Sequence, residues 1–478
     1  MEEKIMANKI SRRDFLKVGA LGAASAIVAG CTPPATPTQA PAAPPATKAP
    51  EVKPTDAPPT AVPTKKPVTL DFQAWGDNAD LPAWEKLVQM YQERNPHVTI
   101  KYSPVAEPNA NFYPQLQTSI AGGTPPDVSS FQGWEWQTYA DKGLLAPVDD
   151  FVKRDGFGAL YPQDVKGIID TTVRKGATYL IPLQVATMLM FYAKKPFDDA
   201  GIPYPTDDWT FEEFLEIAQK LTNTSGEKKM FGLQANGSWF RDIGWIRGTG
   251  KREFDSLVDP KKAQFNQPEI VEIVQKMAQD VIYSMKIAPS PADTSGGANT
   301  FQTGNCAMKY EGPWWFPAMN SPKLREEGKG IPFDVVLMPK VADESRPHRG
   351  WAEGVALLNG DAVEEAWGFA SFMASEEGDK IYSETTGRMP NNLALLESFW
   401  IPTVQEKFQF SNAKAFIEAF KRSQVDVIGG VPRSKMNAEV VKPLAYDKLV
   451  NNSAKAADVL PEVDKALQAL LDEYWANA

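Results

Sequence analysis

Residues 68–102, VTLDFQAWGDNADLPAWEKLVQMYQERNPHVTIKY, change their hydrophobic period twice within one stretch. Apolar and polar residues alternate over 68–75, which predicts a strand. Over 84–91 the apolar residues recur at helical spacing, and an Asn-Pro pair then ends the helix. Alternation resumes at Val98 and predicts a second strand. The order strand, helix, strand is typical of a parallel sheet with helices packed on its faces.

The same succession continues along the chain. Helices are predicted over 112–123 and 136–143, each ended by a glycine, with a short strand over 126–131 between them. A second region begins with a strand over 186–194 and an amphipathic helix over 210–221. The sequence therefore predicts an α/β protein, and the chain is long enough for two domain-sized cores. Ligands of such sheets bind beyond the carboxyl ends of the strands.

The N-terminal segment, 1–31, has the features of an export signal. Arg12 and Arg13 precede an apolar run that is too short to span a bilayer comfortably, and small residues lead to Cys31 in the string VAGC. The arginine pair resembles a twin-arginine signal. VAGC resembles the lipobox of bacterial lipoproteins, in which cleavage leaves the cysteine as a lipid-carrying N-terminus. The alternative is an ordinary hydrophobic N-terminal helix whose cysteine is incidental.

Residues 32–67 are predicted to form a disordered tether. They are mostly Pro, Ala and Thr, with no large aromatic residue. Such a segment has little to bury, and its prolines cannot donate backbone hydrogen bonds, so we expect it to stay extended and solvated.

The composition excludes several classes of function. The 478-residue chain has a net charge of -10 at pH 7, which argues against nucleic acid as a partner, because phosphates call for a basic footprint. Of the 2 cysteines one is the predicted lipid site, so Cys306 has no disulfide partner and is interpreted as a buried thiol. The chain has only 2 histidines, which argues against histidine catalysis and against metal sites built from several histidines. We expect no cofactor and no metal.

Ordered blocks of sequence between residues 68 and 392 carry a family resemblance. They are AWGD, ERNPHVTIKY, SIAGGTPPDV, YADKGLLAPVDDF, YLIPLQ, FYAKKPFDDAGIPYP, FQTGNCAMKYEGPWW and FDVVLMP. In this order and spacing they resemble the extracellular solute-binding proteins of bacterial ABC importers, in the branch that includes maltose-binding protein. One departure is Ala193, where the family commonly has an asparagine between Tyr and Lys, so no role for an asparagine is expected there.

The resemblance implies a periplasmic-binding-protein-like α/β fold, in which two α/β lobes are joined by a hinge and hold ligand in the cleft between them. It assigns 68–182 and 340–385 to the N-terminal lobe, and 183–339 and 386–478 to the C-terminal lobe. The expected hinge crossings, at IPLQ, LMPK and TGRMP, each place a proline beside an apolar strand.

The resemblance also implies which segments build the cleft. The residues expected to bind ligand are Trp75, Asp77, Trp134, Glu135, Gln184, Thr187, Trp314, Trp351, Glu353 and Arg388. Structural roles are the alternatives for four of them: core packing for Trp75, a helix cap for Asp77, a strand position for Thr187 and a surface ion pair for Arg388.

The string EGPWW, residues 311–315, gives the most specific of these expectations, because it assigns different roles to two adjacent tryptophans. It matches the segment that presents a tryptophan to sugar in the family, and Trp314 is the expected stacking platform. Adjacent side chains on an extended segment point opposite ways, so Trp315 is expected to pack behind it.

These residue types favour a carbohydrate ligand. A pyranose has apolar C–H faces that fit an aromatic plane, and a rim of hydroxyls that carboxylates, amides and arginine can satisfy. A phosphorylated ligand would call for a cluster of Arg or Lys, whereas the predicted segments offer mainly acids and Arg388. Glycerol phosphate esters and polyamines stay open, the latter because acids and aromatic rings also suit cations.

We therefore predict a binding protein and not an enzyme. It would be a monomer, lipid-anchored at the extracytoplasmic face of the cell membrane, that captures an oligosaccharide by lobe closure and delivers it to the transmembrane subunits of an ABC importer. One alternative is a glycoside hydrolase that uses Glu135 and Glu353 as paired carboxylates. Another is a binding or sensing subunit for a non-sugar solute on the same fold.

Overall fold

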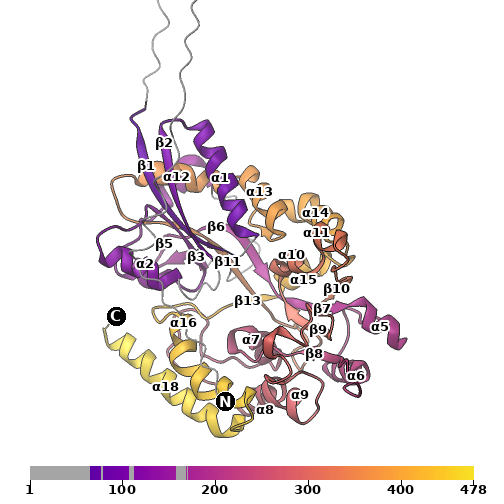
Figure 1. Cartoon of the computed structure of the whole chain (residues 1–478). Helices are drawn as coiled ribbons and strands as arrows, with labels where there is room; N and C mark the ends of the chain where they lie inside the picture. Colours follow the sequence, from indigo (N-terminus) through magenta and orange to yellow (C-terminus); the bar gives the residue numbers. More distant parts are fainter. Residues whose placement is uncertain (1–64, 77–78, 107–111, 158–167, 169–170, 478) are drawn as a thin grey trace, which may run out of the picture. The chain divides into compact units, whose positions relative to one another are not determined.

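The structure is a computed structural model that describes residues 65–76, 79–106, 112–157, 168 and 171–477. The predicted signal over 1–31, most of the tether and Asp77 lie outside the described residues. The chain divides into two units, 1–64 and 65–478, and only the second is described here (Figure 1). Within the described residues, no helix combines the length and apolar character that a membrane crossing requires.

The larger of the two main sheets has seven strands in the order β12-β6-β11-β3-β1-β2, with β13 pairing to β11. As the opening stretch predicts, β1 (Val68–Gly76) and β2 (Val98–Ala106) are parallel and are joined by α1 (Asp80–Arg94). Strand β11 runs antiparallel to both of its main neighbours, β3 and β6. The remaining strands of this sheet are β3 (Val128–Gln132), β6 (Ile181–Thr187), β11 (His348–Leu357), β12 (Met389–Pro390) and β13 (Ser423–Val425).

Helices cover the two faces of the larger sheet. On one face, Leu70 and Phe72 of β1 pack with Trp84 of α1 and with residues of α12 (Val363–Met373) and α13 (Glu376–Thr386). Figure 1 shows α12 and α13, in orange, beside the indigo α1, although these helices lie far apart along the chain. The opposite face packs against α2 (Phe112–Ala121) and α3 (Gln137–Asp141).

The smaller sheet has four strands in the order β10-β7-β9-β8. Its strands are β7 (Leu189–Ala193), β8 (Phe231–Gln234), β9 (Cys306–Glu311) and β10 (Phe333–Val336). Nearly every side chain on these strands is buried, because helices pack around the sheet. The longer of those helices are α6 (Phe211–Leu221), α7 (Trp239–Gly248), α8 (Pro268–Gln275), α14 (Ile401–Phe408), α15 (Lys414–Lys421) and α18 (Ala456–Asn477).

Shorter elements complete the described chain. They are α4 (Asp149–Asp155), β4 (Val173–Arg174), β5 (Ala177–Thr178), α5 (Lys194–Ala200), α9 (Val281–Tyr283), α10 (Phe316–Asn320), α11 (Pro322–Glu326), α16 (Arg433–Met436) and α17 (Asp447–Val450). Several short 3-10 and π-helical turns lie between them, of which the turn Pro313–Trp315 matters for the site.

A single residue links the two sheets at the first crossing. Strand β6 ends at Thr187 and β7 begins at Leu189, so Met188 alone separates a strand of the larger sheet from one of the smaller. The lobe boundary expected at 182/183 falls inside β6, whose residues up to Thr187 pair with β11. Strands β12 and β13, from the 386–478 stretch, likewise pair in the larger sheet. The exact division of the chain between the lobes stays a prediction.

Candidate functional site

A cavity of about 780 Å³ lies between elements of the larger sheet and α7, the Pro313–Trp315 turn and α16. Its polar and aromatic lining suits a small solute. Seven of the ten residues expected to bind ligand line it, namely Trp75, Trp134, Glu135, Trp314, Trp351, Glu353 and Arg388. The structure thus brings together side chains from segments that are far apart in the sequence.

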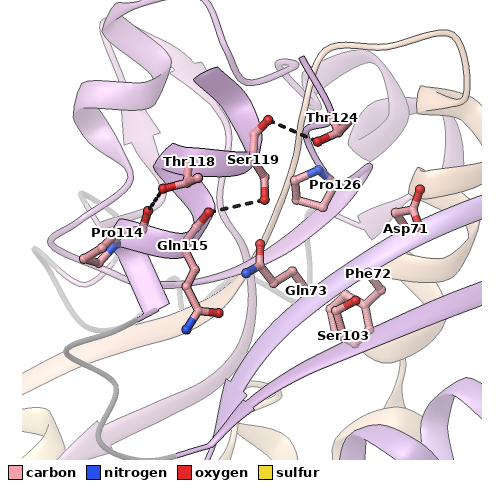
Figure 2. Close-up of a pocket in the computed structure, with 10 residues that line it drawn as sticks. All are labelled: Asp71, Phe72, Gln73, Ser103, Pro114, Gln115, Thr118, Ser119, Thr124 and Pro126. Carbon is pink, nitrogen blue, oxygen red and sulfur yellow. Dashed lines mark hydrogen bonds between the residues drawn. The ribbon is translucent and has the colours of Figure 1, made fainter. Parts of the chain in front are cut away.

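A second hollow, of about 670 Å³, lies between β1, the edge strand β2 and α2 (Figure 2). Among the described residues it is lined mainly by short polar side chains, with no tryptophan or arginine. The hydroxyls of Thr118, Ser119 and Thr124 donate to nearby backbone carbonyls, so their donors are already engaged. The larger, aromatic cavity is therefore the candidate site.

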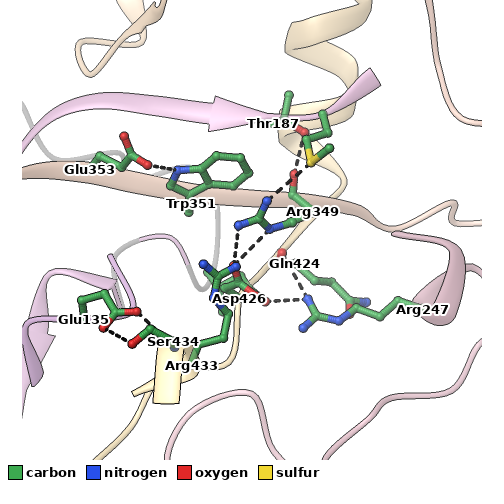
Figure 3. Close-up of polar contacts among 12 residues, drawn as sticks. Glu135, Thr187, Arg247, Arg349, Trp351, Glu353, Gln424, Asp426, Arg433 and Ser434 are labelled. Carbon is green, nitrogen blue, oxygen red and sulfur yellow. Dashed lines mark hydrogen bonds and ion pairs between the residues drawn. The ribbon is translucent and has the colours of Figure 1, made fainter. Parts of the chain in front are cut away.

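Strand β11 forms one wall of this cavity with Arg349, Trp351 and Glu353, which alternate along the strand and share one face. Trp351 Nε1 donates to Glu353 Oε1 at 2.8 Å (Figure 3). Gln184 Nε2 donates to Glu353 Oε2 at 2.6 Å. Burial raises the pKa of Glu353, although the charge of Arg388 opposes the shift. The carboxyl group of Glu353 is thus held in one orientation at the cavity wall.

Two residues that were expected to bind ligand, Gln184 and Thr187, do not line the cavity, which corrects that expectation. Gln184 lies behind the wall, where its amide positions Glu353. Thr187 is fully buried, and its Oγ1 donates to the Arg349 carbonyl at 2.9 Å and lies 3.1 Å from Ser423 Oγ. Both side chains are engaged inside the protein, that of Gln184 with Glu353 and that of Thr187 with the Arg349 carbonyl and Ser423.

Arg388 is held by a buried ion pair and not by the surface ion pair that was its structural alternative. Its Nε and Nη2 donate to the two carboxylate oxygens of Asp80, at 2.8 and 2.6 Å. Tyr382 adds a third hydrogen bond to Asp80, at 2.9 Å. This two-point contact fixes the plane of the guanidinium at the cavity wall.

The cavity contains more cationic groups than the sequence indicated. Arg241 of α7, Arg349 of β11 and Arg433 of α16 line it together with Arg388. The expectation that the site would offer mainly acids and Arg388 is therefore wrong. Arg349 alternates with Trp351 and Glu353, so strand periodicity could have revealed it. Arg433 follows a Gly-Gly-Val-Pro string with no periodic pattern.

Three of these guanidinium groups lie against aromatic rings, and that of Arg241 is 5.4 Å from the ring centre of Trp314. The central guanidinium carbon of Arg349 is 4.1 Å from the ring centre of Trp351 and 5.0 Å from that of Trp134. The equivalent carbon of Arg433 is 4.0 Å from Trp134 and 4.6 Å from Phe240, a cavity residue that the sequence analysis missed. Cation–π contacts of this kind hold the charged groups in place.

The tryptophan pair occupies a short 3-10 turn, Pro313–Trp315, and not the extended segment that was expected. Pro313 suits the first position of such a turn, and successive side chains around it still diverge by about 120°. Trp314 lines the cavity, with its ring centre 5.6 Å from that of Trp351. Trp315 lies against Phe301 and Lys309 and is not part of the cavity wall. The two rings thus have the separate surroundings that the sequence predicted.

Glu135 makes a direct contact between the two sides of the cavity. It follows β3, and its carboxyl oxygens accept hydrogen bonds from Ser434 of α16, from the backbone N–H at 3.1 Å and from Oγ at 2.7 Å (Figure 3). Burial raises the pKa of Glu135 to about 7, even though the bonds from Ser434 and the charge of Arg433 pull it down.

Comparison with known proteins identifies the class to which this fold and cavity belong. Residues 86–410 match a family model described as bacterial extracellular solute-binding protein, and the chain belongs to this family. The ABC substrate-binding protein Lmo0181 from Listeria monocytogenes, solved in complex with cycloalternan, superimposes with a TM-score of 0.72 at 23% identity, over 85% of this chain and 100% of that one. The predicted periplasmic-binding-protein-like fold, with two α/β lobes, is thereby confirmed.

Curated relatives of the chain are binding proteins as well. It is 24% identical over 307 residues to the maltotriose-binding protein of Pyrococcus abyssi. The match covers 62% of this chain and 60% of that protein. It is 25% identical over 337 residues to the galactooligosaccharide-binding protein of Bacillus subtilis. This match covers 65% of this chain and 72% of that protein.

Proposed function

We propose that this protein is the extracytoplasmic binding subunit of an ABC importer and that it captures an oligosaccharide between its lobes. The cavity is the observation that carries this proposal, because the partly exposed rings of Trp75 and Trp314 offer apolar planes beside the carboxyl group of Glu353. Membership of the solute-binding family and the saccharide ligands named for its relatives support it.

The proposed ligand contacts are the seven predicted residues of the cavity wall. Trp314 is the central stacking platform, and Arg388, Glu353 and Glu135 supply polar contacts to sugar hydroxyls. Asp77 stays in the proposal on the family resemblance alone. Gln184 acts indirectly, by orienting Glu353.

We also propose that the protein binds without chemical turnover. The two carboxyl groups that a hydrolase would use, those of Glu135 and Glu353, each accept two hydrogen bonds from protein donors. A retaining or inverting hydrolase needs one carboxyl group as a proton donor and the other free to act on the sugar or on water. Incubation with the oligosaccharides that bind, followed by product analysis, tests this: any released sugar that vanishes in Glu353→Gln would establish hydrolysis instead.

Calorimetric titration of the mature protein tests the carbohydrate proposal. The panel contains maltotriose, galactooligosaccharides, a glycerol phosphate diester and a polyamine. We expect an oligosaccharide to bind with a dissociation constant near the micromolar range, which corresponds to about -8 kcal/mol. Binding of the diester or the polyamine, with no response to any sugar, would overturn the proposal in favour of the non-sugar alternative.

The membrane anchor is a separate proposal, because it rests on the sequence of the N-terminal segment 1–31. We expect Cys31→Ala to release or mislocalise the protein, because acylation of Cys31 would supply the apolar chains that hold it at the membrane. More than one acyl chain is needed, since a single chain gives only marginal attachment. Cell fractionation measures the effect. A processed variant that still fractionates entirely with membranes would rule out the lipobox.

A further inference from the structure

We infer that the oligosaccharide carries an acidic group and that Arg349 and Arg433 receive it. This inference rests on the proposed function and deepens it, because it specifies the chemical class of the sugar. It follows from three features of the cavity: a surplus of positive charge, buried donors without an acceptor, and guanidinium groups that are already held in place.

The charge surplus lies at Asp426, which two arginines share. One oxygen of this carboxylate, Oδ2, accepts hydrogen bonds from Arg349 Nε at 3.0 Å, from Arg349 Nη2 at 2.7 Å and from Arg433 Nη1 at 3.0 Å (Figure 3). All three side chains are more than nine-tenths buried. Two positive charges therefore meet one negative charge in a region where water screens poorly.

Neighbouring ionisable groups have other partners. Arg247 pairs with Glu253 at 2.6 Å, and Arg241 pairs with Glu311 at 2.5 Å. The Glu135 carboxyl accepts from Ser434 and that of Glu353 from Trp351 and Gln184, so neither forms a hydrogen bond with the arginine pair. The charge of Arg433 still acts on Glu135 and that of Arg349 on Glu353, but burial raises the pKa of both carboxyl groups. Among the described residues Asp426 is thus the carboxylate that hydrogen-bonds to the arginine pair.

The pKa values agree with this charge balance. Burial lowers the pKa of Arg349 to about 10, and the nearby charge of Arg433 adds to the decrease while Asp426 opposes it. Burial raises the pKa of Asp426, but the charges of the two arginines outweigh it and hold this pKa below its usual range. The guanidinium groups thus repel each other, and a second anion would relieve that repulsion.

Two buried donors on the cavity wall lack an acceptor. Arg433 Nε and Trp134 Nε1 have no hydrogen-bond partner in the described part of the chain, and both residues line the cavity. A buried N–H group without an acceptor is unfavourable. A carboxylate has only acceptor sites and carries a negative charge, so it can accept from a donor of this kind and balance the surplus. A neutral sugar hydroxyl can accept a hydrogen bond but cannot balance the charge.

The arginines need little rearrangement to bind an anion. Arg349 lies against Trp351, and Arg433 lies against Trp134 and Phe240, at the distances given above. Because the guanidinium groups are already fixed by these rings and by Asp426, the entropy lost on binding is small.

The test compares an acidic sugar with its neutral form on the unaltered protein. Digalacturonate and its dimethyl ester have the same sugar framework and differ in charge. We expect the acid to bind at least about tenfold more tightly, the gain of one charge-assisted interaction, with the difference shrinking as salt rises. Glucose 1-phosphate is the third probe, and tighter binding of this probe than of digalacturonate would identify the acidic group as a phosphoryl group. An ester that binds as tightly as the acid would overturn the inference.

Variants locate the acidic contact. Arg433→Gln is expected to remove the preference for the acid, whereas Lys435→Gln, an exposed cation on α16 that lines the same cavity, should keep it. Melting curves establish that both variants fold. Equal loss in both variants would indicate a general positive field and contradict the assignment to Arg433.

Failure of this inference and failure of the proposed function give different results. If neutral oligosaccharides bind at least as tightly as acidic ones, the inference fails and the proposed function stands. If no sugar, acidic or neutral, binds to the folded protein, the proposed function fails and the inference fails with it.

Discussion

Gly312 determines where the Trp314 ring can lie. The backbone of Gly312 is extended, with φ of -121° and ψ of 179°, so its requirement is one of space and not of conformation. A Cβ atom at this position would lie 2.0 Å from the ring of Trp314. The glycine of EGPWW therefore makes room for the ring to fold back over the chain.

This close approach predicts the effect of Gly312→Ala. We expect the added methyl group to displace the Trp314 ring and to weaken oligosaccharide binding by about tenfold or more, although residue 312 itself need not touch the ligand. Calorimetric titration measures the change. An affinity equal to that of the unaltered protein would show that the position of this ring is unimportant for binding.

Trp314 and Trp315 form a matched pair for separating function from packing. Trp314→Ala is expected to cost about 2 kcal/mol of binding, roughly thirtyfold in affinity, because it removes a central aromatic anchor. Trp315→Ala should leave affinity close to that of the unaltered protein and lower the melting temperature, since its ring packs against Phe301. Titration and thermal melting of both variants give the comparison. If Trp314→Ala mainly lowered the melting temperature and Trp315→Ala mainly weakened binding, Trp315 would be the ligand contact and Trp314 the packing residue.

At the level of single residues, local sequence patterns predicted only part of the site. The family resemblance indicated Trp351 and Glu353, and both line the cavity. Arg349, Trp351 and Glu353 alternate along β11, so strand periodicity in this string would have added Arg349. Phe240 and Arg433 carry no such signal, because packing between distant elements brings them to the cavity.

At the level of elements, the contact between the segment after β3 and α16 should depend on pH. Glu135 has a pKa of about 7 in the fold against an ordinary value of 4.5, so folding favours its protonated form. Its contribution to stability is complete below pH 4.5 and is lost as pH rises through about 7. Between pH 5 and pH 8 the unaltered protein should therefore lose up to about 3 kcal/mol more unfolding free energy than Glu135→Gln.

The comparison with Glu135→Gln is essential to this experiment. Burial also raises the pKa of Asp242 to about 7 and that of Asp379 to about 8, and both shifts have the same sign. The total slope of stability against pH thus includes several groups, and only the difference between the two proteins reports Glu135. Parallel slopes in denaturant titrations at the two pH values would contradict the assignment.

Hydrophobic periodicity predicted the presence of helices and strands better than it predicted the residues at which they begin and end. Strand β1, helix α1 and strand β2 could be read from one stretch, because each has a clear hydrophobic period. The extent of β6 could not, because 183–187 join the larger sheet by pairing with β11, a strand that follows much later in the chain. Strand β13 and helix α16 are short, and their place depends on the same long-range packing.

At the level of the whole molecule, binding is expected to bring the lobes together. A cavity lined from both sides gains its full set of contacts only when the lobes close on the ligand. Small-angle scattering of the mature chain should therefore show a smaller radius of gyration with an oligosaccharide that binds than without it. An unchanged radius with a saturating ligand would contradict a hinged mechanism.

The crossing at Met188 has a consequence for the order of events during capture. A link one residue long can bend but cannot lengthen, so rotation about it leaves β11, the partner of β6, complete on one side. We therefore expect an arriving ligand to dock on Trp351 and Glu353 of β11 before α7 reaches it. The β11 wall is then expected to set the association rate of the ligand, and the contacts from α7 are expected to set its dissociation rate. The two walls are thus expected to contribute to affinity through different rate constants.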